Sequence, residues 1–173
     1  EATNHYFKHL GVSDGLSQVC IPSIYQDELG AVWLGTTEGL NRYNGKDVKV
    51  FQPSESNHGL TNNEINELCG DKNGRMYIRS GNDLIKLDIY TEQFTCLRQK
   101  GVYGLFCKKD TLWVSCADGI YYYTGQGTEL TFFARVQKGF VGRALYVDRE
   151  TVWVVTRKYL VAISREDPLR QEI

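Results

Sequence analysis

One aromatic residue recurs along this chain at nearly constant spacing, each time inside a short apolar run. The four residues are Trp33, Tyr77, Trp113 and Trp153, and the gaps between them are 44, 36 and 40 residues. The runs are rich in β-branched and aromatic residues, the composition of β-strands. No segment carries apolar residues at sustained helical spacing. We therefore expect an all-β chain with almost no helix.

Each aromatic residue stands in the second of about four strand-like segments, and units of four strands repeating about every 40 residues are typical of β-propeller blades. We predict a single partial propeller domain over residues 1–173. The predicted blades are 15–58, 59–100, 101–138 and 139–173, preceded by an N-terminal closing strand at 1–14. The fourth blade is predicted to be incomplete, because 168–173 is a poor outer strand. These features indicate a fragment of a larger propeller.

The turns between first and second strands share a second signature. Asp27 and Asp71 open two of these turns, and Gly30 and Gly74 close them; Asp148 opens the turn of the fourth blade. An aspartate side chain bonds the backbone just ahead of it, and glycine adopts positive φ without steric cost. The predicted structural repeat comprises Asp27, Gly30, Trp33, Asp71, Gly74, Tyr77, Trp113, Asp148 and Trp153. Gly39 and Gly119 enter third strands, where we expect a tight turn with no room for a Cβ.

Composition and motifs argue against several classes of function. The chain has a formal net charge of -1, so it lacks the positive electrostatic field that attracts nucleic acid. The five cysteines show no C-x-x-C pair and no metal-ligand spacing with the three histidines. We expect buried thiols, with one disulfide, a metal site or a redox site as the alternatives. The recurring aspartates fit turns better than paired catalytic carboxylates, so we predict no catalytic centre, no metal and no cofactor.

Four residues are candidates for contact with a ligand. Aligning the first strands by the turn aspartate places Ser23, Glu67, Gly104 and Ala144 at one position, which is charged only at Glu67. This carboxylate is solvated, paired with Arg143, or a polar contact for a ligand. Arg42 and Tyr43 could serve carbohydrate binding, in which aromatic faces meet sugar C–H surfaces beside polar groups; packing is the alternative.

One phrase of the sequence resembles the two-component regulator propeller repeat. The phrase consists of Gly15-Leu16-Ser17, Ser23-Ile24-Tyr25-Gln26-Asp27, Gly30, Val32-Trp33-Leu34-Gly35-Thr36 and Gly39-Leu40-Asn41-Arg42-Tyr43. It restarts at Gly59-Leu60-Thr61-Asn62-Asn63-Glu64-Ile65 and is degenerate after about Lys100. The resemblance implies a seven-bladed propeller in the periplasmic sensor region of a Bacteroides-type hybrid two-component system. Such a protein is anchored in the inner membrane and carries a histidine kinase and a response regulator.

Two classes of function follow from these observations. The resemblance implies an extracytoplasmic domain that senses a signal, usually an oligosaccharide released from a glycan. The alternative is a propeller scaffold for protein–protein contact without a small ligand. We also expect the remaining blades of the full-length chain, or a second copy in a homodimer, to cover the apolar faces that four blades leave bare.

Overall fold

The computed structural model describes residues 8–54, 59–137 and 141–173, and these fold into four antiparallel sheets of four strands each. The first sheet contains β1 (Ser23–Gln26), β2 (Val32–Thr36), β3 (Gly39–Tyr43) and β4 (Val48–Phe51). The second contains β5 (Ile65–Gly70), β6 (Arg75–Ser80), β7 (Asp83–Asp88) and β8 (Gln93–Arg98). The third contains β9 (Val102–Lys108), β10 (Thr111–Cys116), β11 (Gly119–Tyr123) and β12 (Thr131–Ala134). The fourth contains β13 (Val141–Val147), β14 (Thr151–Thr156), β15 (Leu160–Ser164) and β16 (Gln171–Glu172).

These sheets are propeller blades, and the predicted all-β propeller fold is confirmed. In every sheet the strands pair in sequence order. The first strands of consecutive blades contact one another, β1 with β5, β5 with β9 and β9 with β13. The described residues contain one 3-10 turn, Val12–Asp14, and no α-helix; none of their helices is long and apolar enough to cross a membrane.

The recurring aromatic residues occupy equivalent places in the four second strands. Trp33 is paired with Tyr25 of the first strand, Tyr77 with Cys69, Trp113 with Phe106 and Trp153 with Tyr146. Trp33 and Tyr77 are fully buried. This repeated register confirms that the 40-residue period of the sequence is the period of the blades.

The turn aspartates hold their turns as predicted. Oδ1 of Asp27 accepts hydrogen bonds from the N–H groups of Leu29 and Ala31, at 3.0 and 2.9 Å. Oδ1 of Asp71 does the same for Asn73 and Arg75, at 2.8 and 3.2 Å, and Oδ1 of Asp148 for Glu150 and Thr151, both at 2.8 Å. Gly30 and Gly74 have φ values of 86° and 87°, in the left-handed region that favours glycine.

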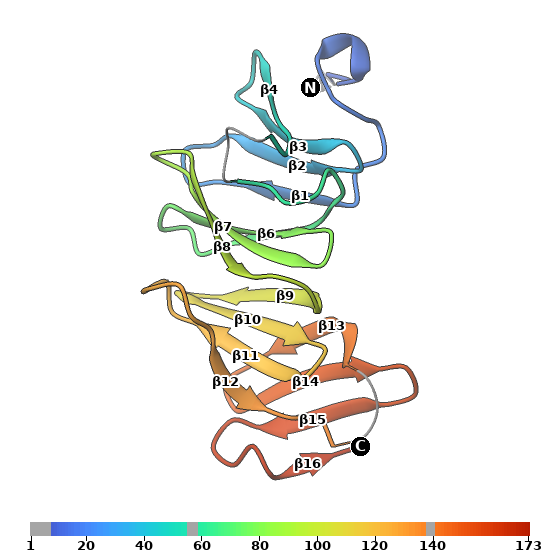
Figure 1. Cartoon of the computed structure of the whole chain (residues 1–173), viewed down its shortest axis with the longest axis vertical. Helices are drawn as coiled ribbons and strands as arrows, with labels where there is room; N and C mark the ends of the chain where they lie inside the picture. Colours follow the sequence, from blue (N-terminus) through green and yellow to red (C-terminus); the bar gives the residue numbers. More distant parts are fainter. Residues whose placement is uncertain (1–7, 55–58, 138–140) are drawn as a thin grey trace, which may run out of the picture.

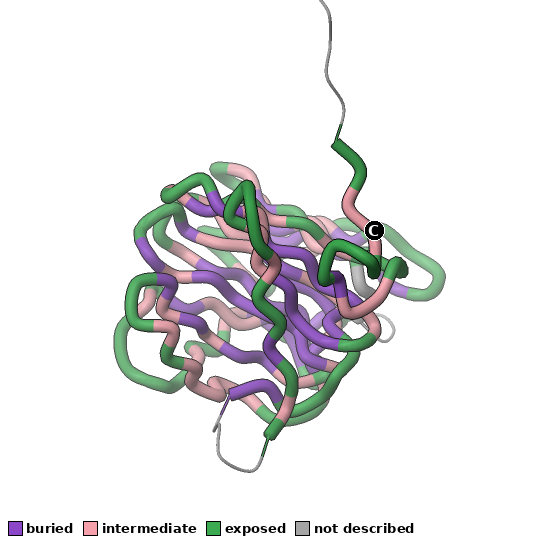
Figure 2. Tube along the Cα trace, turned by 90° about the horizontal axis from the view of Figure 1, so that it is seen from above, coloured by how far each residue is buried: buried purple, intermediate pink, exposed green. Residues whose placement is uncertain are grey.

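Three apolar clusters form the core, one at each boundary between consecutive blades. Trp33 of the first blade packs with Met76, Ile78 and Leu87 of the second. The second cluster joins Tyr77 to residues of the third blade, and the third joins Trp113 to residues of the fourth. Figure 2 shows the buried residues running through the middle of the stacked sheets and the exposed ones in the connecting turns. Trp33, Tyr77 and Trp113 are thus each covered by the blade that follows.

The two ends of the stack differ from the sequence expectation in detail. The fourth blade, predicted to be incomplete, has a short outer strand of its own, because β16 pairs with β15 at Ala162 and Ile163. Residues 8–14 of the predicted closing strand contain no strand, and the rest of that segment lies outside the described residues. The first and fourth blades lie at opposite ends of the stack in Figure 1, so the four blades form an open arc.

Candidate functional site

The carboxylate of Glu67, on β5, links the second blade to the third. Its Oε2 accepts a hydrogen bond of 3.3 Å from Nε of the buried Arg79, and its Oε1 accepts one of 3.1 Å from the N–H of Leu105 on β9. Ser23 takes the corresponding position in the first blade, and its hydroxyl accepts a hydrogen bond of 2.9 Å from the N–H of Leu68 on β5. This strand position therefore ties the first strand of one blade to the first strand of the next.

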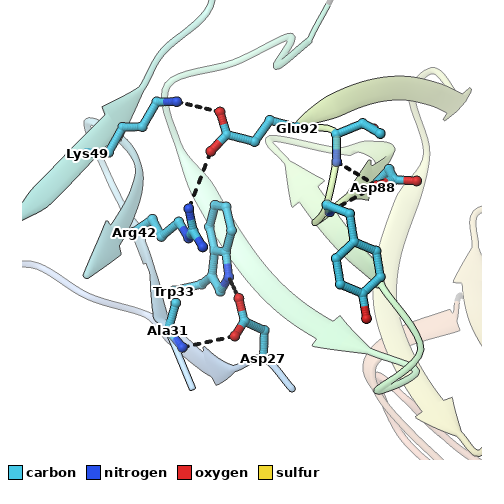
Figure 3. A network of polar contacts seen from close by, with 9 residues as sticks. Asp27, Ala31, Trp33, Arg42, Lys49, Asp88 and Glu92 are labelled. Atoms are coloured by element: carbon cyan, nitrogen blue, oxygen red, sulfur yellow. Dashed lines mark hydrogen bonds and ion pairs between the residues drawn. The ribbon is translucent and has the colours of Figure 1, made fainter. Parts of the chain in front are cut away.

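Arg42, on β3, lies at the boundary between the first and second blades (Figure 3). Its guanidinium is 5.5 Å from the ring centroid of Trp33, and Nη1 is 3.4 Å from Oε1 of Glu92. Lys49 forms an ion pair with the same carboxylate. Arg42 thus stacks on a core aromatic and pairs with an acid of the neighbouring blade, a contact that stabilises packing.

Glu92 is presented by a turn of the second blade that Asp88 organises. Oδ1 of Asp88 accepts hydrogen bonds from the N–H groups of Tyr90 and Thr91, both at 2.9 Å. The hydrogen bond from Thr91 is the main reason that the pKa of Asp88 lies below its usual range. Glu92 itself has a φ of 56°, which completes the turn. The side chain of Glu92 therefore reaches back to the first blade.

The other two predicted residues are not brought to the same place. The hydroxyl of Tyr43 donates a hydrogen bond of 2.7 Å to the carbonyl of Gly45 in its own hairpin, and Nζ of Lys8 donates one of 3.1 Å to that hydroxyl. Arg143 belongs to β13, and its side chain lies outside the described residues. The structure thus distributes the described candidates over separate contacts within and between blades. Contact of any of the four with a ligand stays a prediction.

A groove between the third and fourth blades has the features of a binding site. It encloses about 490 Å³. We call it the cationic groove, and its lining residues are Lys108, Lys109, Asp110, Thr111, Trp113, Arg149 and Arg165. Four of these seven side chains are positively charged at neutral pH and one is negatively charged. The cations come from the last residue of β9, the turn between β9 and β10, the turn between β13 and β14, and the residue after β15.

Two of the four cations of the groove, Lys108 and Arg165, donate hydrogen bonds to backbone carbonyls. Nζ of Lys108 donates a hydrogen bond of 3.1 Å to the carbonyl of Val147. Nη1 of Arg165 donates to the carbonyls of Asp148 and Arg149, at 2.9 and 3.0 Å, and its guanidinium lies 5.4 Å from the ring centroid of Trp113. A carbonyl orients a cation without neutralising its charge. The groove therefore presents a positive field beside an aromatic wall, a setting that attracts an anionic ligand.

One feature of the sequence indicates the cationic groove. Lys108 occupies the position in the third blade that Asp27 occupies in the first. Trp33 pairs with Tyr25, two residues before Asp27, and Trp113 pairs with Phe106, two residues before Lys108. The third blade thus places a cation where the other three blades place a turn aspartate. Arg149 and Arg165 lie 41 and 57 residues further along the chain, and only the packing of the fourth blade brings them to the same groove. Among the described residues, no group of three histidine, cysteine or acidic side chains could hold a metal ion.

The comparison with protein families gives one match, over residues 15–38, to the two component regulator propeller. Residues 15–38 are thus similar to a two component regulator propeller repeat. The repeat includes Asp27, Gly30 and Trp33, the residues that form the turn and the buried aromatic of the first blade. A protein of Formosa agariphila named histidine kinase P4 is 40% identical over 50 residues, which are 29% of this chain and 4% of that protein.

Solved structures share the fold of this chain. The extracellular domain of a hybrid two component system from B. thetaiotaomicron matches with a TM-score of 0.77 at 21% identity, over 95% of this chain and 26% of that one. The extracellular domain of a one component system from the same bacterium matches with a TM-score of 0.74 at 18% identity, over 99% and 27%. The computationally designed Ika4 protein matches with a TM-score of 0.63 at 15% identity, over 87% and 94%. The chain spans about a quarter of the bacterial structures.

Proposed function

We propose that this chain is part of the periplasmic sensor region of a hybrid two-component regulator, a protein anchored in the inner membrane that also carries a histidine kinase. The repeat at residues 15–38 is the observation that carries the proposal. The 50 residues shared with histidine kinase P4 and the fold shared with extracellular domains of two-component systems support it. In this role the blades themselves catalyse no reaction and report a bound signal to the kinase.

The proposed signal is an oligosaccharide derived from a glycan, and the cationic groove is where we propose that it binds. Lys109 and Arg149 offer charged donors in the groove. Trp113 also lines the groove, but it is 5% exposed and packs in the core between the third and fourth blades. Ammonium and guanidinium groups favour carboxylate or sulfate groups on the sugar, the guanidinium by paired hydrogen bonds. We therefore favour an acidic oligosaccharide over a neutral one.

Isothermal titration with two oligosaccharides of equal length tests the groove. We expect an oligogalacturonide to bind the 173-residue chain, with an affinity that falls as salt is added, and a neutral gluco-oligosaccharide to bind at least tenfold more weakly. The double variant Lys109→Gln, Arg149→Gln should lose this binding. Lys46→Gln, in a hairpin of the first blade, is the matched control and should keep it. If the double variant binds the acidic sugar as well as the wild-type chain does, the groove is not the site.

The sensor role has a test that is independent of the groove. In the full-length protein reconstituted in vesicles, we expect autophosphorylation of the kinase to change when an activating oligosaccharide is added to the propeller side. Removal of residues 15–173 should abolish that response while the basal phosphorylation persists. A full-length protein without kinase activity, or one whose response survives this deletion, would refute the sensor role.

The apolar face at the open end of the fourth blade favours further contacts with protein. Val152, Val154 and Val161 of this blade point toward the third blade and are fully buried. The opposite face carries Val155 and Leu160, paired across β14 and β15 and exposed by 41% and 55%. Trp153 lies on this second face. We propose that the remaining blades of the full-length chain cover it, and that a second copy covers it in the isolated chain as a homodimer.

A further inference from the structure

Two cysteines from neighbouring blades meet across the boundary between the second and third blades. Sγ of Cys69, on β5, lies 2.7 Å from Sγ of Cys107, on β9. Two non-bonded apolar atoms in contact are usually about 4 Å apart. Cys69 is paired with Tyr77 in its sheet and Cys107 with Leu112 in the next, so both thiols lie on the facing sides of the two blades. The packing of the blades thus holds the two sulfurs together.

The other three cysteines are placed differently. Cys20 is exposed, Cys96 is on the outer strand β8, and Cys116 is buried at the end of β10. Among the described residues, the contact between Cys69 and Cys107 is the one contact between two sulfur atoms. Apolar side chains surround them in a cluster that includes Leu105 and Tyr123. With no third metal-binding side chain grouped with them among the described residues, the pair has the surroundings of a disulfide and not of a metal site.

We propose that Cys69 and Cys107 form a disulfide that ties the second blade to the third. The oxidant is an external disulfide, either a small molecule or a disulfide-bearing oxidoreductase. One thiol loses its proton and attacks the external disulfide, which releases one thiolate and leaves a mixed disulfide. The thiolate of the other cysteine then attacks the sulfur of the first cysteine in this mixed disulfide. The bond between Cys69 and Cys107 forms, and the remaining half of the oxidant leaves as a thiolate. The protein loses two protons and two electrons, and the oxidant becomes two thiols.

Burial decides when the bond can form. Burial, followed by the contact with Cys107, raises the pKa of the Cys69 thiol well above its usual range. The thiolate is the nucleophile in this exchange, so the folded and reduced protein reacts slowly. The bond is therefore made while the blades are still opening and closing during folding. The proposal does not depend on the sensing role of the chain.

Peptide mapping after refolding tests the bond. The reduced and unfolded 173-residue chain is refolded with oxidised and reduced glutathione, and free thiols are alkylated under denaturing conditions. We expect three alkylated cysteines out of five, and a tryptic product in which 50–72 is linked to 101–108. Cys69→Ala and Cys107→Ala should each abolish that product, whereas Cys20→Ala and Cys96→Ala should keep it. Five alkylated cysteines in a folded wild-type chain, or a bond between other cysteines, would overturn the proposal.

Thermal unfolding gives a second readout that does not depend on a single variant. A bond between residues 38 positions apart restricts the unfolded chain. We expect the Tm of the oxidised wild-type chain to exceed that of the same chain unfolded in excess dithiothreitol by roughly 5–10 °C. The Cys69→Ala, Cys107→Ala double variant should show no such difference. Equal Tm values for the oxidised and reduced wild-type chain would contradict the proposed bond.

Discussion

The indole nitrogen of Trp33 donates a hydrogen bond of 2.8 Å to Oδ2 of Asp27 across the first turn of the first blade. Asp27 is 4% exposed, and its other oxygen accepts hydrogen bonds from Leu29 and Ala31. The fourth blade repeats the arrangement, with 2.9 Å between the indole nitrogen of Trp153 and Oδ2 of Asp148. One carboxylate thus fixes both the turn and the orientation of the recurring aromatic.

We expect Asp27→Ala to lower the free energy of unfolding by about 3 kcal/mol, because it removes three hydrogen bonds to a buried carboxylate and leaves the donors without a partner. Asp148→Ala removes the equivalent bonds at a more exposed turn, so its cost should be smaller. Urea unfolding followed by tryptophan fluorescence measures both. A cost for Asp27→Ala that is no larger than that for Asp148→Ala would contradict the role of burial.

The two glycines that begin third strands, Gly39 and Gly119, offer a test of close packing. Gly39 has a φ of 121°, and a Cβ there would lie 2.6 Å from the carbonyl oxygen of Phe51; Gly119 has the same relation to Ala134 at a φ of 152°. Gly30 has a φ of 86° but open space around it. We expect Gly39→Ala to cost about 3 kcal/mol, from backbone strain and overlap together. Gly30→Ala should cost about 1 kcal/mol, from strain alone. Urea unfolding measures both costs. If Gly30→Ala lowers the free energy of unfolding more than Gly39→Ala does, the overlap at Gly39 adds little to the cost.

Alkaline pH should destabilise the fold. Burial raises the pKa of the Tyr77 phenol, and it raises the pKa of the Cys116 thiol to about 12. The unfolded chain releases these protons at ordinary values, near 8.5 for cysteine and 10 for tyrosine, whereas the folded chain keeps them. The folded state therefore binds more protons above these values, and stability falls as pH rises.

The urea midpoint measured from pH 7 to 11 checks this sign. We expect it to be nearly constant up to about pH 8, to decline above it and to fall most steeply above about pH 10. The hydroxyl of Tyr77 is buried and has no hydrogen-bond partner among the described residues. Tyr77→Phe should therefore fold normally at pH 7 and lose less stability above pH 10. A wild-type midpoint that rises over this interval would show that the sign is wrong.

The sequence predicted the fold because each blade carries its own local signals. The turn of Asp27 and the strand of Trp33 are encoded within seven residues, so a repeated pattern sufficed. The partners of Glu67 and Arg42 could not be found in this way. Leu105 lies 38 residues after Glu67, and Glu92 lies 50 residues after Arg42. These residues come into contact only when neighbouring blades pack against each other.

The cationic groove shows the same limit. Trp113, which lines the groove, belongs to the repeat that the sequence shows, but the cations come from two different blades. The third blade has Lys108 where the other blades have a turn aspartate. This difference is visible in the sequence, but it does not show that Arg165 lies in the same groove. Contacts within a blade follow from a period of about 40 residues, whereas contacts between blades depend on how much each sheet twists and curves.

The open face of the fourth blade is the feature on which the proposed contacts with further blades and with a second copy depend. Among the described residues, no blade follows the one that carries Trp153, although Trp33, Tyr77 and Trp113 are each covered by a following blade. Light scattering and sedimentation velocity on the isolated chain, over a hundredfold dilution, test most directly whether that face is an interface. We expect a dimer at high concentration that dissociates on dilution, and a monomer throughout for the variant Val155→Lys, Leu160→Lys. The mass of a single chain at every concentration of the wild-type protein would contradict the proposed interface.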